Sequence, residues 1–542
     1  MRALVLVASV LIACGGNSTP QSQQPLSATW TAPSMLAKVP ADSPYLVAVL
    51  DPMPDFVRKQ SFGAIDKKLA EAIALLEANP TADRSALTIK ERLTLAFLDE
   101  LKGKDLASWG RELGFDPSGR FVLYGLSVWP VMRVSVGNEQ KLREVIGRVI
   151  AKSGIPIEQH TLQGRMYWQL SKDNMTAIVS VTGGEIVAAA LPTPALAQYL
   201  PIILGLQAPP HSLSDNKKLA AMIRRYHFMP TMVGYIDAQI VADILAQRAE
   251  TTNTELDRPM RKAIGPVSDI CRADLDRLVE VMPRVVFGYR QLDTKGMHAT
   301  MVAEMPAELT ASLQRLHTSV PELGEGLGQR VLARFGVAAK LDELMPLLRA
   351  LTDHIRAKPF QCSWFTSLND AAGKLAKLLD TPVPAPLLGF RGMSFVLDDI
   401  SKNPEMPQGH ALVVGDHAYD LLLMLLKLVG MGGVAIHPDG KPVQLPLAQL
   451  GAPASVSAFV ASRVDRVSVA MGPNSARDVV RSLDQPMPKH SPLLTMAFDA
   501  KRMLEVGLIK PEDASGMRDL AMQLDVGPEG LRFEMFGTFP GP

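Results

Sequence analysis

A short pattern that recurs four times constrains the fold of this chain more than any other feature. Each copy starts at a proline or glycine, continues through a mainly apolar run, and ends at an aspartate seven positions after the start. An apolar run of about six residues suits a buried strand. An aspartate directly after a strand suits the N-cap of a helix, because its carboxylate accepts hydrogen bonds from the first free helix N–H groups. The sequence therefore predicts four strand–aspartate–helix units, which end at Asp51, Asp237, Asp416 and Asp499.

Several hairpin-like segments lie between these units. The clearest are 164–190, 284–304, 434–443 and 520–536, where apolar alternation is interrupted by turn residues such as glycine, proline and aspartate. Adjacent hairpins with interspersed helices favour an α+β fold, in which mainly antiparallel sheets are covered by helices. An α/β doubly wound parallel sheet is the alternative.

The sequence also predicts two related halves. Val131 to Val136 resembles Val464 to Val469, each segment precedes a helical stretch, and each half then reaches one of the aspartate units and a final hairpin. We expect a first α+β module at 35–330 and a second at 331–542, with insertions in one of them because the distances between matching segments differ.

The N-terminus has the features of an export signal. One basic residue, Arg2, is followed by a short apolar run that ends at Ala13 and is too short to span a membrane. Leu11-Ile12-Ala13-Cys14 resembles the lipobox of bacterial lipoproteins. The resemblance implies that residues 1–13 are a removed signal peptide, that Cys14 carries the lipid, and that 14–34 is a lipidated flexible tether. An aspartate directly after the lipidated cysteine would resemble an inner-membrane retention signal. This chain has Gly15 at that position, which favours the outer membrane.

The two remaining cysteines, Cys271 and Cys362, form an even pair in a compartment that permits disulfides. We expect a disulfide between them. A catalytic thiol at one position or two buried thiols are the alternatives.

Charge and motifs exclude several classes of function. The 56 basic and 55 acidic residues nearly cancel and form no long basic run, so a nucleic-acid partner is not expected. The sequence has no zinc-protease motif, phosphate-binding loop or nucleophile elbow. His410 and His417, beside Asp416, make the only close histidine group, and we interpret them as solvated or hydrogen-bonded. No catalytic, cofactor-binding or metal-binding residue is assigned.

The opening Val39 to Pro44, the aspartate units, Asp439 to Pro442 and the two cysteine segments resemble large predicted bacterial envelope lipoproteins of unknown function. That class implies a location in the cell envelope, facing the periplasm or the cell surface, but no active site. We expect a membrane-anchored, non-enzymatic binding or structural module with an envelope protein partner. The 26 methionines make a carrier of a lipid or other apolar ligand the alternative. An enzyme with a non-local site is the third possibility.

Overall fold

The computed structural model describes residues 33–539 except 58–69, 72, 75–86, 105, 117–118, 249–253, 325–330, 403–404, 451–455 and 511–517. The expected signal peptide 1–13, Cys14 and all of the tether 14–34 except its last two residues lie outside the described residues. The chain divides into two compact units. Unit 1 comprises residues up to 268 and 284–294, and unit 2 comprises 269–283 and 295 to the C-terminus.

Unit 1 is built around an antiparallel sheet. In this unit β1 pairs with β2 and β8, β3 pairs with β2 and β7, and β9 pairs with β8. The strand order is therefore β9-β8-β1-β2-β3-β7-β6-β5-β4. Its described elements are η1 (Ser34–Lys38), β1 (Tyr45–Val49), α3 (Ile89–Leu101), α4 (Leu106–Leu113), β2 (Phe121–Leu126), β3 (Trp129–Ser135), α5 (Glu139–Ser153), β4 (Glu158–Leu162), β5 (Arg165–Lys172), β6 (Met175–Thr182), β7 (Glu185–Pro192), η3 (Thr193–Ala195), α6 (Leu196–Ile203), α7 (Lys218–Tyr226), β8 (Val233–Asp237), α8 (Ala238–Leu245), α9 (Thr254–Ile264) and β9 (Arg284–Asp293).

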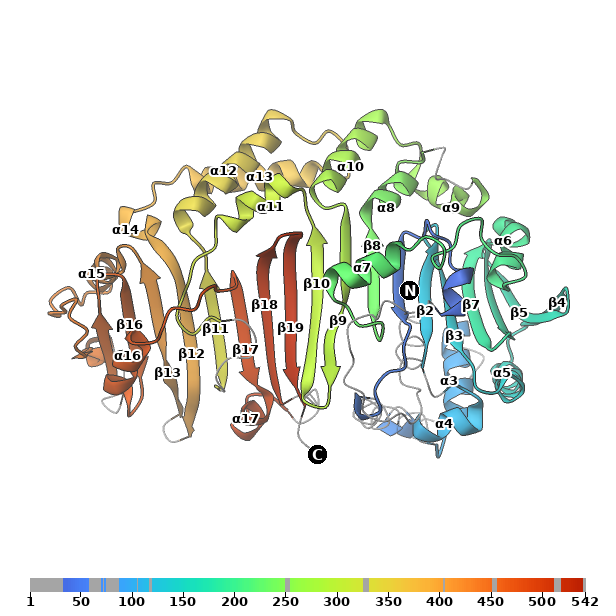
Figure 1. The fold of residues 1–542 in the computed structure, drawn as a ribbon, viewed down its shortest axis with the longest axis horizontal. Coiled ribbons are helices and arrows are strands. Elements are labelled where there is room, and N and C mark those ends of the chain that lie inside the picture. The colour runs from blue at the N-terminus through green and yellow to red at the C-terminus, as the bar shows by residue number, and fades with distance from the viewer. Residues whose placement is uncertain are drawn as a thin grey trace. The chain divides into compact units, whose positions relative to one another are not determined.

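Unit 2 also contains an antiparallel sheet, in the order β10-β19-β18-β17-β11-β12-β13-β16-β15-β14. Helices α12 and α13 lie along one end of its strands (Figure 1). Its described elements are α10 (Asp269–Val281), β10 (Gly296–Glu304), α11 (Ala307–Gln314), β11 (Ala333–Ala338), α12 (Leu341–Ala357), α13 (Thr366–Leu379), α14 (Ala385–Leu388), β12 (Phe390–Lys402), β13 (Glu405–Gly415), α15 (Ala418–Leu428), β14 (Val443–Gln444), η4 (Leu447–Leu450), β15 (Ala458–Ser462), β16 (Arg466–Met471), α16 (Ser475–Leu483), β17 (Leu494–Asp499), α17 (Ala500–Glu505), β18 (Asp519–Gly527) and β19 (Gly530–Thr538).

The chain thus combines helices with mainly antiparallel sheet, as an α+β fold requires. Every strand pair named above is antiparallel, so the doubly wound parallel alternative is wrong. The hairpin expected at 164–190 is confirmed as β5, β6 and β7, and that expected at 520–536 is confirmed as β18 and β19.

The hairpin expected at 434–443 is wrong. Only Val443 and Gln444 form a strand there, and they pair with β15. Ile436 instead packs in the apolar cluster beneath α15, and its carbonyl accepts a hydrogen bond from the Tyr419 hydroxyl at 3.0 Å. Tertiary packing therefore replaces the local pairing that the turn residues suggested.

Two of the four aspartate units end as the sequence predicts. Asp237 caps α8 by accepting the Ile240 N–H at 3.1 Å, and Asp499 caps α17 by accepting the Arg502 N–H at 2.9 Å. The prediction is wrong for Asp416, whose carboxylate pairs with Arg391 while His417 precedes the first residue of α15. After Asp51 the chain is irregular through residue 54 before a helical segment begins.

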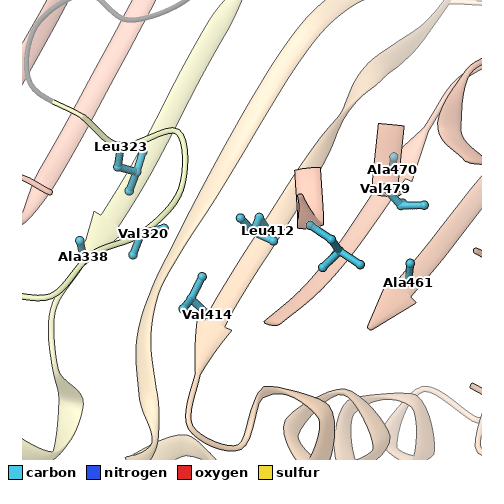
Figure 2. Packing of buried hydrophobic residues seen from close by; sticks show 9 residues of the cluster. Val320, Leu323, Ala338, Leu412, Val414, Ala461, Ala470 and Val479 are labelled. Carbon is cyan, nitrogen blue, oxygen red and sulfur yellow. The ribbon is translucent and has the colours of Figure 1, made fainter. Parts of the chain in front are cut away.

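One apolar core of unit 2 lies between its sheet and α16. It joins Leu412 on β13, Ala461 on β15 and Ala470 on β16 to Val479 and Leu483 of the helix. Val320 and Leu323 belong to the same cluster and approach it from the segment that precedes β11 (Figure 2). The same segment carries Glu322, whose carboxylate contacts Ser394 on β12 and His410 on β13.

Candidate functional site

The sheet of unit 2 has an unusual distribution of polarity between its two faces. On the six strands from β12 to β10, one row of neighbouring residues is polar apart from one glycine, and all of its members are buried. The row consists of Ser394, Gly336, Thr495, Gln523, Glu534 and Thr300. Buried polar side chains are the exception in proteins, so a row of them marks a face that differs from an ordinary core.

The opposite face of the same six strands is entirely apolar. Because side chains alternate between faces along a strand, it is formed by three positions on each strand. Its three rows are Met393, Val337, Leu494, Leu524, Phe533 and Met301; then Phe395, Phe335, Met496, Met522, Met535 and Ala299; then Leu397, Ala333, Phe498, Leu520, Gly537 and Met297. We call this set of residues the apolar face. None of its side chains is charged or can donate a strong hydrogen bond.

The apolar face is open. Apart from Gly537, none of its members is buried, and the exposed fraction reaches 43% at Phe395, 41% at Met496 and 44% at Met301. Strand spacing gives it a width of about 24 Å and a height of about 14 Å. A continuous apolar surface of that size is of the kind that marks an interaction site on a soluble domain.

Unit 1 has a smaller exposed apolar region of its own. Ile236 on β8 is 48% exposed, and it pairs with Val285 of β9 and with Tyr45 of β1, which are half-buried. Val47 and Leu123 continue this side of the sheet and are also half-buried. The buried side of these strands is also apolar. These strands of unit 1 therefore differ from those of unit 2, where a buried polar row lies opposite an exposed apolar face.

Several polar groups on the buried side of the unit 2 sheet have hydrogen-bond partners from other segments. Gln523 donates to the carbonyl of Gly324 at 3.0 Å, and Glu534 lies 3.0 Å from the Nε2 atom of His298. These contacts offset the cost of removing polar groups from water. Gln523 and Glu534 of the polar row therefore have side-chain or backbone partners within the fold.

Asp525 of β18 lies at one end of this polar side, between two histidines. His317 Nε2 is 3.1 Å from its Oδ1 atom, and His490 Nε2 is 2.7 Å from its Oδ2 atom. Burial raises the pKa of the Asp525 carboxyl, but hydrogen bonds from the two histidines outweigh it and leave that pKa below its usual value. The carboxylate is therefore ionised at neutral pH.

His410 on β13 forms a second buried ionic cluster. Its Nε2 atom lies 2.8 Å from Glu322, whose other oxygen accepts from the Ser394 hydroxyl at 3.0 Å, and its Nδ1 atom lies 3.8 Å from Asp398. Burial lowers the pKa of His410, but the carboxylates of Asp398 and Glu322 outweigh it and raise that pKa to about 9. Burial also lowers the pKa of neighbouring Arg334. His410 is thus held as a cation in a structural ion pair.

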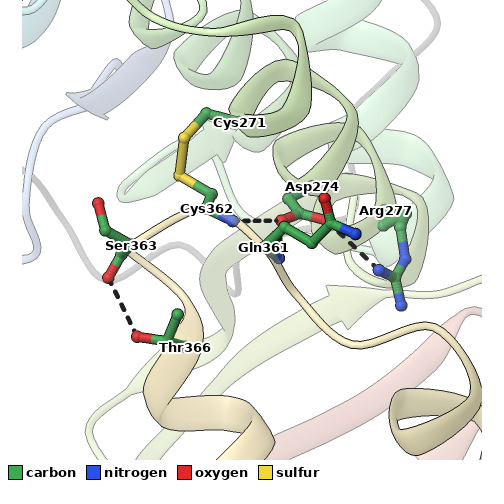
Figure 3. Close-up of a disulfide and its surroundings, with 7 residues drawn as sticks. All are labelled: Cys271, Asp274, Arg277, Gln361, Cys362, Ser363 and Thr366. Atoms are coloured by element: carbon green, nitrogen blue, oxygen red, sulfur yellow. Dashed lines mark hydrogen bonds and ion pairs between the residues drawn. A yellow bond between two sulfur atoms is a disulfide. The ribbon is translucent and has the colours of Figure 1, made fainter.

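The two cysteines for which the sequence predicts a disulfide lie together within unit 2. The sulfur atoms of Cys271 and Cys362 lie 2.01 Å apart, at bonding distance. Beside them, Asp274 of α10 accepts the backbone N–H groups of Gln361 at 2.8 Å and Cys362 at 2.9 Å (Figure 3). Arg277 lies 3.4 Å from the Asp274 carboxylate. This cluster fastens α10 to the segment after α12 and does not resemble a reactive thiol site.

The other histidine that the sequence singled out does not join His410. His417 is exposed and lies 3.3 Å from Asp420, one turn along α15. The sequence interpretation missed the apolar face, because strand alternation alone does not say which set of side chains is covered. It also missed the approach of His317 to His490, since these residues are far apart in the sequence.

No protein-family model matches this chain, and no curated protein matches it significantly. In the part of the chain that the structure describes, none of the helices combines the length and apolar character that crossing a bilayer requires.

Proposed function

We propose that this protein is a membrane-anchored, non-enzymatic lipoprotein that binds the acyl chains of lipids on the apolar face of unit 2. The observation that carries the proposal is that all three positions on each of six neighbouring strands are apolar while none of their side chains is buried. Leaving such a surface in water is unfavourable by roughly 25 cal/mol for each Å² of apolar area. An apolar ligand would remove that cost.

Acyl chains suit this surface better than a protein partner does. Protein interfaces surround their apolar centre with polar groups that form hydrogen bonds, whereas the apolar face has no side chain suited to this. Its backbone N–H and C=O groups are directed along the sheet to neighbouring strands, so an added strand cannot bind there. Five methionines, at 297, 301, 496, 522 and 535, supply flexible thioether side chains that adapt to irregular apolar ligands.

The expected anchor fits the same role. In this proposal residues 1–13 are removed, Cys14 carries the lipid, and the tether that follows holds the folded units in the cell envelope at the outer membrane. A tethered protein meets lipids at a high local concentration, so even a modest affinity for acyl chains would suffice. The partner surfaces are then the membrane, through the lipid on Cys14, and individual lipid molecules.

We also propose that the two units are copies of one ancestral module. In each unit, one strand (β1 or β11) lies between the next strand along the chain (β2 or β12) and the strand that ends in a capping aspartate (β8 or β17). Asp237 and Asp499 are therefore equivalent. The similarity between Val131 to Val136 and Val464 to Val469 does not support the duplication, because β3 and β16 occupy different places in the two orders.

The lipid proposal is tested with the purified chain in which Cys14→Ser prevents acylation, and with cis-parinaric acid as a fluorescent fatty acid. Met496→Glu places a charge at the centre of the apolar face, and because Met496 is exposed the fold should tolerate it. We expect the affinity for the probe to fall by at least about tenfold, which corresponds to ~1.4 kcal/mol.

Leu378→Glu is the matched control, since Leu378 is 69% exposed on α13 and lies outside the sheet. It should leave the probe affinity unchanged. Failure of the unsubstituted chain to bind the probe, or equal binding by the two variants, would refute the proposal. Photocrosslinking from position 496 in the native envelope separates the alternatives, because capture of a protein in place of lipid would favour the envelope-partner hypothesis.

A further inference from the structure

We propose that His317, His490 and Asp525 form a binding site for a transition-metal ion of the Zn²⁺ type. One ligand atom from each residue lies within 4.8 Å of those of the other two. Imidazole nitrogens and a carboxylate oxygen are ligands that zinc accepts, and three protein ligands with one open position make a common zinc geometry. This inference does not depend on the proposed lipid binding.

The three side chains come from separate segments that the fold holds together. His317 follows the C-terminus of α11, His490 precedes β17, and Asp525 is on β18. Near the histidines, the Ser491 hydroxyl donates to the carbonyl of Val320 at 3.1 Å and accepts the Val320 N–H at 2.9 Å. This pair of hydrogen bonds links the two histidine-bearing segments, so the imidazoles are positioned independently of any metal.

The exposure of the cluster suits a cation. The Asp525 side chain is only 4% exposed, while the side chains of His317 and His490 are 25% and 30% exposed. The carboxylate therefore lies behind two imidazoles that solvent can reach, which gives an ion a route of entry. Arg532 Nη2 lies 3.6 Å from Asp525 Oδ2, on the oxygen that His490 also contacts. Asp525 Oδ1 forms no ion pair with an arginine or lysine among the described side chains, and it is the oxygen we assign to the metal.

Both imidazole rings present their Nε2 atoms to the Asp525 carboxylate. Each Nε2 atom lies within hydrogen-bonding distance of an Asp525 oxygen. A divalent ion would take the place of these hydrogen bonds and bind the same atoms. The centroids of the two imidazole rings lie 4.5 Å apart, and the ring planes meet at 70° in an edge-to-face arrangement. Both Nε2 atoms contact the same carboxylate.

The test uses the full chain, treated with a chelator and then titrated with Co²⁺, whose visible absorption reports its ligands. We expect one Co²⁺ per chain at micromolar concentrations and displacement of the Co²⁺ by Zn²⁺. His317→Gln and His490→Gln should each weaken binding by at least about tenfold, the smallest loss typical of residues that only support a metal ligand.

His298→Gln is the matched control, because His298 also pairs with a buried carboxylate, Glu534, on the same sheet but has no second histidine beside it. It should leave Co²⁺ affinity unchanged. Circular dichroism of all three variants checks that the fold is retained. Absence of Co²⁺ binding by the unsubstituted chain, or equal binding by a correctly folded His490→Gln variant, would overturn the proposal.

Discussion

Glu185 in unit 1 should be one of the most sensitive positions in the molecule, because it is the buried partner of two cations. Its Oε2 atom lies 3.0 Å from Arg133 Nη1 and its Oε1 atom 2.7 Å from Lys38 Nζ. The side chains of Arg133 and Glu185 are 1% and 6% exposed. Glu185→Gln removes the negative charge but preserves the shape, so its effect isolates the charge pair.

The magnitude follows from what Arg133 retains. Removal of one partner of a buried ion pair costs about 3–5 kcal/mol, because the other charge stays buried without compensation. Arg133 keeps two acceptors at the end of α6, the carbonyls of Ile202 at 3.1 Å and Ile203 at 2.8 Å. We therefore expect Glu185→Gln to lower the free energy of unfolding of unit 1 by about 3 kcal/mol, the lower end of that range.

Tryptophan fluorescence can follow unit 1 alone. Trp364 is the only tryptophan in unit 2, and it is 40% exposed, so Trp364→Phe leaves an unfolding signal that comes from unit 1. Urea titrations in this background compare Glu185→Gln with Glu158→Gln, since the Glu158 side chain is 70% exposed and lies 3.0 Å from His160 on β4. The control should cost no more than about 0.5 kcal/mol. A loss for Glu185→Gln no larger than that of the control would refute the reasoning.

Three other perturbations should have measurable effects on unit 2. The pKa of His410 rises from 6.5 to about 9 on folding, so its stabilising contribution is complete below pH 6.5 and is lost as the pH rises through 9; urea midpoints should fall over that interval in the parent chain but not in His410→Gln. Asp499→Ala removes the N-cap of α17 and should lower the free energy of unfolding by about 1 kcal/mol, measured in urea titrations followed by far-UV circular dichroism; no change would contradict the capping role. Replacing both Cys271 and Cys362 by alanine opens a loop of 91 positions and should cost about 2–5 kcal/mol, whereas an unchanged urea midpoint would show that the bond contributes nothing.

The features that the sequence predicted correctly are those that local interactions determine. The β5–β6–β7 hairpins follow from turns at Asp173 and Gly183, both with positive φ, between alternating strands. The caps at Asp237 and Asp499 need only a strand end and three following N–H groups. Asp416 has the same local sequence features but lies within reach of Arg391, and a nearby cation displaced the cap. Such competition depends on residues brought together by the fold.

The reversed faces of unit 2 are the feature that sequence patterns could not supply. Along β18 polar and apolar residues alternate except at Ala521, and this pattern predicts that Leu520, Met522 and Leu524 are buried while Gln523 and Asp525 are in water. The structure buries Gln523 and Asp525 instead, and it can do so because partners arrive from distant segments, Gly324 for the amide and two histidines for the carboxylate. Polar groups that already have protein partners have little to gain from water, and an apolar face that remains in water gains by binding. The same contacts that stabilise the buried polar side therefore leave the apolar side free for a ligand, which is why the proposed lipid site and the proposed metal site lie on opposite faces of one strand.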